Sequence, residues 1–197
     1  RVPAAPRRPA QPPGRARAHT LYKEGRYEAA IMSATEARSD PQFADAAALV
    51  VARAHLERFR LGADPSDLST ARETLAAIDS EALTPRDQVD VVIGLGQTLY
   101  FARSYGAAAE IFDSALSRAA VLEPRDRLLL LDWWASSLGR EVQTRPAEGR
   151  QPLFERIQDR MEEELRPDAS NPVANYWLPV AARGAGALDR AWAAAIA

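Results

Sequence analysis

Residues 95–115, LGQTLYFARSYGAAAEIFDSA, carry the clearest structural pattern in this chain. Large and small side chains recur there at helical spacing on both sides of a short turn. The positions that form the pattern are Leu95, Gly96, Leu99, Tyr105, Ala108, Phe112 and Ala115. Small side chains let paired helices approach closely, and large ones fill the space between neighbouring pairs. The stretch therefore predicts two packed helices, at residues 85–103 and 105–121.

The same order of residue types recurs near the start of the chain. The matching positions there are Ala18, Leu21, Gly25, Tyr27, Ala30, Ala37 and Pro41, with Ala34 where a large residue is expected. Two regions match more loosely: one contains Ala52, His55, Ala71 and Leu75, with residues 62–65 inserted in its turn, and the other contains Leu178, Gly186, Leu188 and Ala191. A further pair, around Leu131–Leu138 and Phe154–Met161, is inferred mainly from its position.

These residues resemble the pattern of the tetratricopeptide repeat family. Ala30, Ala71 and Ala108 lie 41 and 37 positions apart, which is longer than the family's usual period of about 34 residues. Armadillo and HEAT repeats have nearer periods but lack the glycine, tyrosine and alanine of this turn. The resemblance implies an all-α fold, a right-handed α-α superhelix or tetratricopeptide-like solenoid of about five helical hairpins.

Helical periodicity continues between the prolines of the remaining chain, without sustained strand-like alternation. The expected helices cover residues 14–24, 27–39, 43–60, 66–78, 85–103, 105–121, 124–143, 151–166, 171–184 and 187 to the end. Pro41, Pro85, Pro124 and Pro172 are expected at or beside helix starts. Pro179 falls inside an expected helix, which should therefore be kinked or shorter.

The N-terminal segment differs in composition from the rest. Five of the 14 prolines lie within residues 1–13, which predicts an extended Pro/Arg-rich arm or tether, followed by a helical repeat domain over residues 14–197. Arg1, Arg7, Arg8, Arg15 and Arg17 give residues 1–18 a charge of +5, and the total of −2 leaves −7 for the remainder.

Both ends of the chain suggest processing or truncation. It begins at Arg1 rather than Met and ends in a helical pattern at Ala197. A cleaved signal peptide would explain the start and slightly favours a periplasmic or exported protein over a cytoplasmic one. An engineered truncation explains it equally well, so the compartment stays open.

Composition excludes several classes of protein. A chain that is 47% hydrophobic and 26% charged is typical of a soluble globular protein. The absence of cysteine excludes disulfide scaffolds, thiolate metal sites, iron–sulfur clusters and cysteine nucleophiles. The longest aliphatic run, residues 128–131, is far shorter than the roughly 18–20 apolar residues that span a bilayer.

The motifs of common catalytic and cofactor sites are also missing. His19 and His55 have no partner at a metal-ligand spacing, and no Gly-x-Ser-x-Gly motif is present. Gly94 and Gly96 follow no predicted strand, and no glycine-rich loop precedes Lys23. We therefore expect no catalytic activity, no cofactor and no metal.

Two other features invite a functional interpretation. Adjacent residues on a helix point about 100° apart, so in Trp133-Trp134 and Tyr176-Trp177 one ring should pack inside while the other can reach a surface; Trp134 is expected in the core. Glu162–Glu164, together with Arg156, Asp159 and Arg160, are expected to form a solvated helix face.

The resemblance implies a concave groove, lined by the first helix of each pair, that binds a segment of another protein. The residues expected to face it are His19, Tyr22, Lys23, Arg53, Glu57, Gln97, Tyr100, Phe101, Asp132, Ser136, Arg140, Tyr176 and Arg183. The carboxylate-clamp subtype needs paired asparagines and lysines along this face, where the chain has His19, Arg53, Gln97 and Ser136 instead. That subtype is therefore rejected.

The leading hypothesis is a non-catalytic scaffold or adaptor that binds a protein partner in this groove. One alternative is a structural subunit of a larger envelope or filament assembly, with the arm reaching a neighbour. Another is a helical domain of a longer enzyme. Binding to nucleic acid is not expected, because the arginines of the arm are not interleaved with aromatic residues and the remaining chain is acidic.

Overall fold

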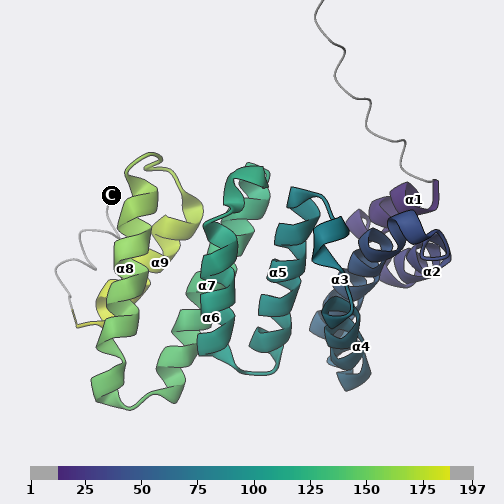
Figure 1. The fold of residues 1–197 in the computed structure, drawn as a ribbon. Helices are drawn as coiled ribbons and strands as arrows, with labels where there is room; N and C mark the ends of the chain where they lie inside the picture. Colours follow the sequence, from purple (N-terminus) through teal and green to yellow (C-terminus); the bar gives the residue numbers. More distant parts are fainter. Residues whose placement is uncertain (1–12, 187–197) are drawn as a thin grey trace, which may run out of the picture. The chain divides into compact units, whose positions relative to one another are not determined.

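The structure, a computed structural model, describes residues 13–186. Over this range the protein is all-helical, with nine α-helices, four short 3₁₀-helices and no β-strand (Figure 1). The α-helices are α1 (Pro13–Lys23), α2 (Tyr27–Ala37), α3 (Ala44–Gly62), α4 (Pro65–Ala76), α5 (Pro85–Phe101), α6 (Tyr105–Leu116), α7 (Pro124–Thr144), α8 (Gln151–Leu165) and α9 (Pro172–Gly184). The 3₁₀-helices are η1 (Pro41–Phe43), η2 (Ser80–Ala82), η3 (Ala119–Val121) and η4 (Ala147–Gly149). None of the described helices is both long enough and apolar enough to cross a membrane.

Proline marks the start of most helices, as the sequence predicts. Pro85, Pro124 and Pro172 are each the first residue of an α-helix, and Pro41 begins η1. Proline suits this position because its fixed φ is already helical and the first turn has no partner for its missing N–H. Thr84 strengthens the start of α5, because its hydroxyl oxygen accepts a hydrogen bond from the backbone N–H of Asp87 at 3.1 Å.

Two expectations about helix bounds are wrong. α6 ends at Leu116 rather than at residue 121, and η3 follows as a separate turn. Residues 62–65 do not lengthen a turn, because α3 continues to Gly62 and α4 begins at Pro65, with Ala63 between them in the left-handed conformation at a φ of 54°.

The helix that contains Pro179 is not shortened, since α9 runs through this residue to Gly184. Of the expected arm at residues 1–13, Pro13 instead begins α1, and the rest of the arm and the tenth helix lie outside the described residues.

The chain forms two compact units, one up to Gly94 and one from Leu95 onward. In the first unit α1 packs on α2, α2 on α3 and α3 on α4. One buried cluster joins Ala18 of α1, Ala34 of α2 and both Val50 and Val51 of α3. The small alanine side chains let these three helices approach closely.

In the second unit α6 packs on α7, α7 on α8 and α8 on α9 (Figure 1). Its largest fully buried apolar side chains are Trp134, Phe112, Leu130, Leu131, Leu138, Ile157, Met161 and Val142. Trp134 is 1% exposed, which confirms its predicted place in the core. Gly96 lies directly against Phe112, so that a Cβ at position 96 would come within 2.5 Å of the ring.

Candidate functional site

Aromatic rings gather in the second unit where the end of α5 meets α7. The ring of Trp133 lies 5.0 Å from that of Tyr100 and 5.8 Å from that of Phe101, both in edge-to-face geometry. All three side chains are half-buried. Each ring therefore contributes to packing and still presents part of its surface to solvent.

A second pair of rings reaches α7 from α9. The indole N–H of Trp177 donates a 2.8 Å hydrogen bond to Oδ1 of Asp132. The same indole lies over Gly139, where a Cβ would stand 3.1 Å from the ring. Tyr176, whose ring is 5.3 Å from that of Trp177, is 62% exposed. The aromatic residues of α9 thus continue those of α5 and α7.

The side of α7 between these two contacts is also open. Successive side chains of a helix are rotated by about 100° around its axis. On α7 this rotation places Leu129, Ser136 and Arg140 on the strip of surface between Asp132 and Trp133. Leu129 is 54% exposed, and Arg140 is exposed as well. We call Tyr100, Phe101, Trp133, Tyr176 and Trp177, with Leu129 and Asp132 beside them, the aromatic face.

The other predicted groove residues of this unit fit the same surface. Gln97 is half-buried on α5, one turn before Tyr100 and Phe101. Arg183 is exposed on α9, seven residues after Tyr176 and hence on the same side of that helix. Three helices of this unit thus carry predicted groove residues: α5 carries Tyr100 and Phe101, α7 carries Asp132, Ser136 and Arg140, and α9 carries Tyr176 and Arg183. Tyr100 contacts the ring of Trp133, and Asp132 accepts the hydrogen bond from Trp177.

In the first unit three predicted groove residues come together. The guanidinium carbon of Arg53 lies 4.9 Å from the ring centre of Tyr22, in cation–π geometry. Burial raises the pKa of the Tyr22 hydroxyl above its ordinary value; the charge of Arg53 opposes this shift, and that of Glu57 adds to it. These side chains form a partly buried polar cluster between α1 and α3.

Arg53 has a second role in this unit. Its Nη1 donates a 3.0 Å hydrogen bond to Oδ2 of Asp90, which also accepts one from Arg86 Nε at 3.2 Å. Asp90 is buried, so these arginines compensate a carboxylate that would otherwise be costly to desolvate. Of the remaining predicted residues, His19 and Lys23 are exposed on α1.

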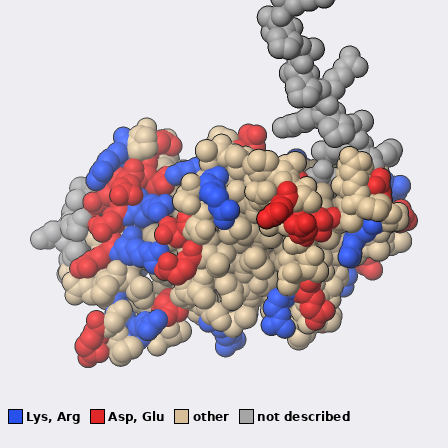
Figure 2. Space-filling view, in the orientation of Figure 1, with Lys and Arg blue, Asp and Glu red and all other residues tan. Residues whose placement is uncertain are grey.

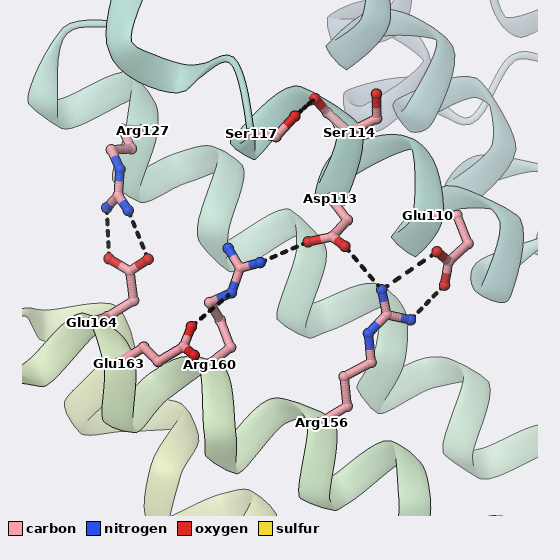
Figure 3. A network of polar contacts seen from close by, with 9 residues as sticks. All are labelled: Glu110, Asp113, Ser114, Ser117, Arg127, Arg156, Arg160, Glu163 and Glu164. Carbon is pink, nitrogen blue, oxygen red and sulfur yellow. Dashed lines mark hydrogen bonds and ion pairs between the residues drawn. The ribbon is translucent and has the colours of Figure 1, made fainter.

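Three of the six residues expected to form a solvated face of α8, namely Arg156, Arg160 and Glu164, instead connect it to α6 and α7, and that interpretation is wrong for these three. Asp113 of α6 accepts from Arg156 Nη2 at 3.2 Å and from Arg160 Nη2 at 2.8 Å (Figure 3). Arg156 also pairs with Glu110. Both guanidinium groups lie over the Trp134 ring, at 5.7 and 5.3 Å from its centre.

The end of α8 is fixed to α7 by a separate pair. Arg127 donates from Nη1 and Nη2 to the two carboxylate oxygens of Glu164, at 2.7 and 2.6 Å (Figure 3). Glu164 is 8% exposed and hence not solvated, whereas Glu163 is exposed. This pairing raises the pKa of the Arg127 guanidinium.

An open pocket of about 320 Å³ lies at this network, between α6, α7 and α8. Its lining includes Asp113 of α6, Trp134 of α7 and, from α8, both acidic residues (Glu155, Asp159 and Glu163) and basic ones (Arg156 and Arg160). Blue and red side chains alternate over α8 in Figure 2, consistent with this mixed charge. Because most of these groups bind one another, the arrangement accounts for helix packing without a ligand.

His55 and Asp67, the titratable pair most suggestive of catalysis, are likewise explained by contacts between helices. His55 Nδ1 lies 2.6 Å from Oδ1 of the buried Asp67, and Arg58 Nε lies 3.4 Å from its Oδ2. Both oxygens of Asp67 are thus engaged, and the contacts join α3 to α4. Within residues 13–186, no group of three or more His, Asp or Glu side chains could hold a metal ion.

Three residues of the aromatic face were not among the predicted groove residues. Helical spacing predicts that one ring of each adjacent aromatic pair can reach a surface, but Trp133, Trp177 and Leu129 are not among the residues that the repeat resemblance assigns to the groove. For Leu129 and Trp133 the signal was available, because they lie seven and three residues before the predicted Ser136 on the same helix. Trp177 gave no such signal, since its place depends on its contact with Asp132.

No protein-family model matches the chain, and no curated protein sequence matches it either.

Proposed function

We propose that the protein is a non-catalytic scaffold or adaptor that binds a segment of a partner protein on the aromatic face. The supporting observation is that α7 and α9 and the end of α5 carry aromatic side chains in contact across neighbouring helices, with Tyr100 against Trp133, Trp177 bonded to Asp132, and Tyr176 62% exposed. Exposed apolar patches on folded proteins mark interaction sites. Tyrosine and tryptophan are also the side chains most often found to dominate binding energy.

The rings are held in place before any partner binds. Edge-to-face contacts fix Tyr100, Phe101 and Trp133, and the hydrogen bond to Asp132 fixes Trp177. A side chain that is already ordered loses little conformational entropy on binding. The face therefore has both the chemistry and the rigidity that a protein-binding surface needs.

The proposal includes a tetratricopeptide-like arrangement, a right-handed α-α superhelix of about five hairpins. It is supported by the packing of adjacent helices within each unit and by Gly96, whose missing side chain leaves room for Phe112. Gly25 adds support, because its φ of 75° forms the turn before Tyr27 at a position that the repeat resemblance assigns to glycine. An experimental structure of the full chain tests this arrangement.

Comparative capture of partner proteins tests the function. Wild type, Tyr176→Ser and Trp133→Ala would be incubated with a lysate of the source organism, and captured proteins quantified by mass spectrometry. Leu61→Ser is the matched control, since Leu61 is 67% exposed but lies on α3 in the other unit. We expect at least one protein to be lost about tenfold or more with both aromatic variants and kept with the control. Identical capture by all four proteins would refute the proposal.

A structural subunit of a larger assembly is the second candidate. It is favoured by the division of charge between residues 1–18, at +5, and the remaining chain, at −7. Oppositely charged regions on one chain attract one another between copies. Light scattering of the purified chain at micromolar concentration tests it, because a strictly monomeric protein would count against this candidate and leave the adaptor proposal standing.

A further inference from the structure

Residues 1–12 contain a regular proline pattern. Prolines occupy positions 3, 6, 9 and 12, which is every third residue. A polyproline II helix has about three residues per turn. In that conformation these four prolines would line one side of the helix, with Arg7 and Arg8 on the other two sides.

The spacing of this pattern matches that of packed helices. Three residues of polyproline II span about 9 Å, and the axes of packed α-helices lie about 8–10 Å apart. In the second unit, the ring of Tyr100 on α5 contacts that of Trp133 on α7, and Trp177 on α9 donates a hydrogen bond to Asp132 on α7. The end of α5 and α9 are therefore both neighbours of α7. Prolines three residues apart can therefore contact the rings of neighbouring helices, in the order α5, α7 and α9.

We propose that the aromatic face of one copy binds residues 1–12 of a second copy as a polyproline II helix, with Pro3, Pro6, Pro9 and Pro12 toward the rings. Grooves lined by aromatic side chains are the surfaces that recognise proline-rich segments, because the ligand is already extended and loses little entropy. This inference rests on the proposed function, since it assigns the class of segment that the same face binds.

Charge favours a second copy as the source of the segment. Residues 1–12 carry +3 from Arg1, Arg7 and Arg8, and the rest of the chain carries −5, so the N-terminal segment of one copy is attracted to the body of another. Such a contact joins two different surfaces, one from each copy, and therefore produces either a dimer in which the copies exchange their arms or a ring or open chain. The four prolines make the specific contact, and the arginines attract the segment to the other copy.

The acidic surface of α8 is the competing site on the same unit. Glu155, Asp159 and Glu163 lie there, but Asp113 is already paired with Arg156 and Arg160. Binding of the arm at α8 would depend on its arginines and fall steeply with salt. Binding at the aromatic face depends chiefly on the prolines and should fall much less steeply with salt. The two sites are thus separable by experiment.

A labelled peptide of residues 1–12 is the probe. It is added to the full chain carrying Pro3→Ser, Pro6→Ser, Pro9→Ser and Pro12→Ser, so that the protein's own segment does not compete. The control peptide exchanges Ala5 with Pro6 and Gln11 with Pro12, which keeps composition and charge but breaks the spacing. Fluorescence anisotropy is expected to show saturable binding of the probe and about tenfold weaker binding of the control.

Variants of the same full chain locate the site. Tyr176→Ser and Trp133→Ala are each expected to weaken binding of the probe about fivefold or more, whereas Asp159→Asn should change it less than about twofold. Tyr176 is mostly exposed, so its variant stays informative even if Trp133→Ala disturbs folding. Equal binding of both peptides, or loss of binding with Asp159→Asn and with salt in place of the aromatic variants, would overturn the proposal.

Association between copies is measured by analytical ultracentrifugation. Wild type is expected to form larger species as its concentration rises, and the four-proline variant is expected to remain monomeric. Wild type that stays monomeric at all concentrations would overturn the choice of a second copy. If partner capture depends on the aromatic face but the peptide does not bind, this inference fails alone; if the peptide binds but no partner is captured, the adaptor proposal fails instead.

Discussion

Trp177 and Asp132 are joined by a hydrogen bond across 45 positions of sequence, with the indole N–H of α9 donating to a carboxylate oxygen of α7 at 2.8 Å. Gly139 lies under the same ring and leaves space for it. The bond also holds the Trp177 ring in place, and the exposed ring of Tyr176 packs against it at 5.3 Å. It connects the packing of this unit to the shape of the aromatic face.

Removing the acceptor should weaken this connection. Asp132→Ala is expected to lower the free energy of unfolding by about 1 kcal/mol, the usual contribution of one hydrogen bond. Asp132→Asn keeps an oxygen at the same place and should retain most of the stability. Urea unfolding measures both, with Arg140→Ala as the control on the exposed side of the same helix. Equal stability of Asp132→Ala and the control would show that the bond contributes nothing.

Close helix packing at Gly96 predicts a second effect. A Cβ at this position would stand 2.5 Å from Phe112 Cε1, and Phe112 is fully buried. We expect Gly96→Ala to destabilise the protein by about 1–3 kcal/mol, although alanine favours a helix more than glycine does by about 1 kcal/mol.

Gly62→Ala is the matched control for this prediction. Gly62 is also helical, as the last residue of α3, but a Cβ there would have no neighbour within 4 Å. Its substitution should leave the thermal midpoint unchanged or slightly raised, by helix propensity alone. A Gly96→Ala protein that melts at or above the Gly62→Ala temperature would contradict the close approach of Gly96 and Phe112.

Local sequence predicts most helix starts and misses some helix ends. Pro85 and Pro124 each begin a helix because proline suits the first turn wherever it occurs. The predicted end of α6 is too late because the apolar pattern continues through Ala119 and Val121, while the α-helix ends at Leu116. Ala119 is buried in the separate turn η3 and Val121 is 43% exposed, so an apolar pattern alone does not distinguish an α-helix from the turn that follows it.

The candidate site could be predicted only in part, for a similar reason. The face of α7 that carries Asp132 and Ser136 follows from helical spacing within one element. The pairs Trp177–Asp132, Arg156–Asp113 and Arg127–Glu164 join residues 37 to 45 positions apart. They depend on how one helix is shifted along another, and no local pattern specifies that shift.

The pair formed by Arg127 and Glu164 gives a third prediction. Arg127→Ala would leave the carboxylate of Glu164, which is 8% exposed, without its bidentate partner. We expect a loss of about 1–2 kcal/mol, less than for a fully buried pair because the Arg127 side chain is partly solvated. Arg125→Ala, at an exposed position two residues earlier, should change urea stability little. A double variant with Glu164→Gln should recover part of the loss, and its failure to do so would contradict an unpaired buried charge as the cause.

Tyr22 gives a prediction about alkaline pH. Burial raises the pKa of its hydroxyl above 10.0, against the opposing charge of Arg53. The unfolded chain therefore releases this proton at lower pH than the folded chain, so the free energy of unfolding should fall as pH rises from about 10 through the folded pKa, by at most about 1.4 kcal/mol per pH unit for one group. Below that range the group has no effect, because both states keep the proton. Urea unfolding between about pH 9 and 11.5 should show a shallower decline for Tyr22→Phe than for wild type, and absorbance at high pH should show one of the five tyrosines ionising late in wild type only. Parallel stability curves for the two proteins would mean that the hydroxyl of Tyr22 is not shielded from water between α1 and α3.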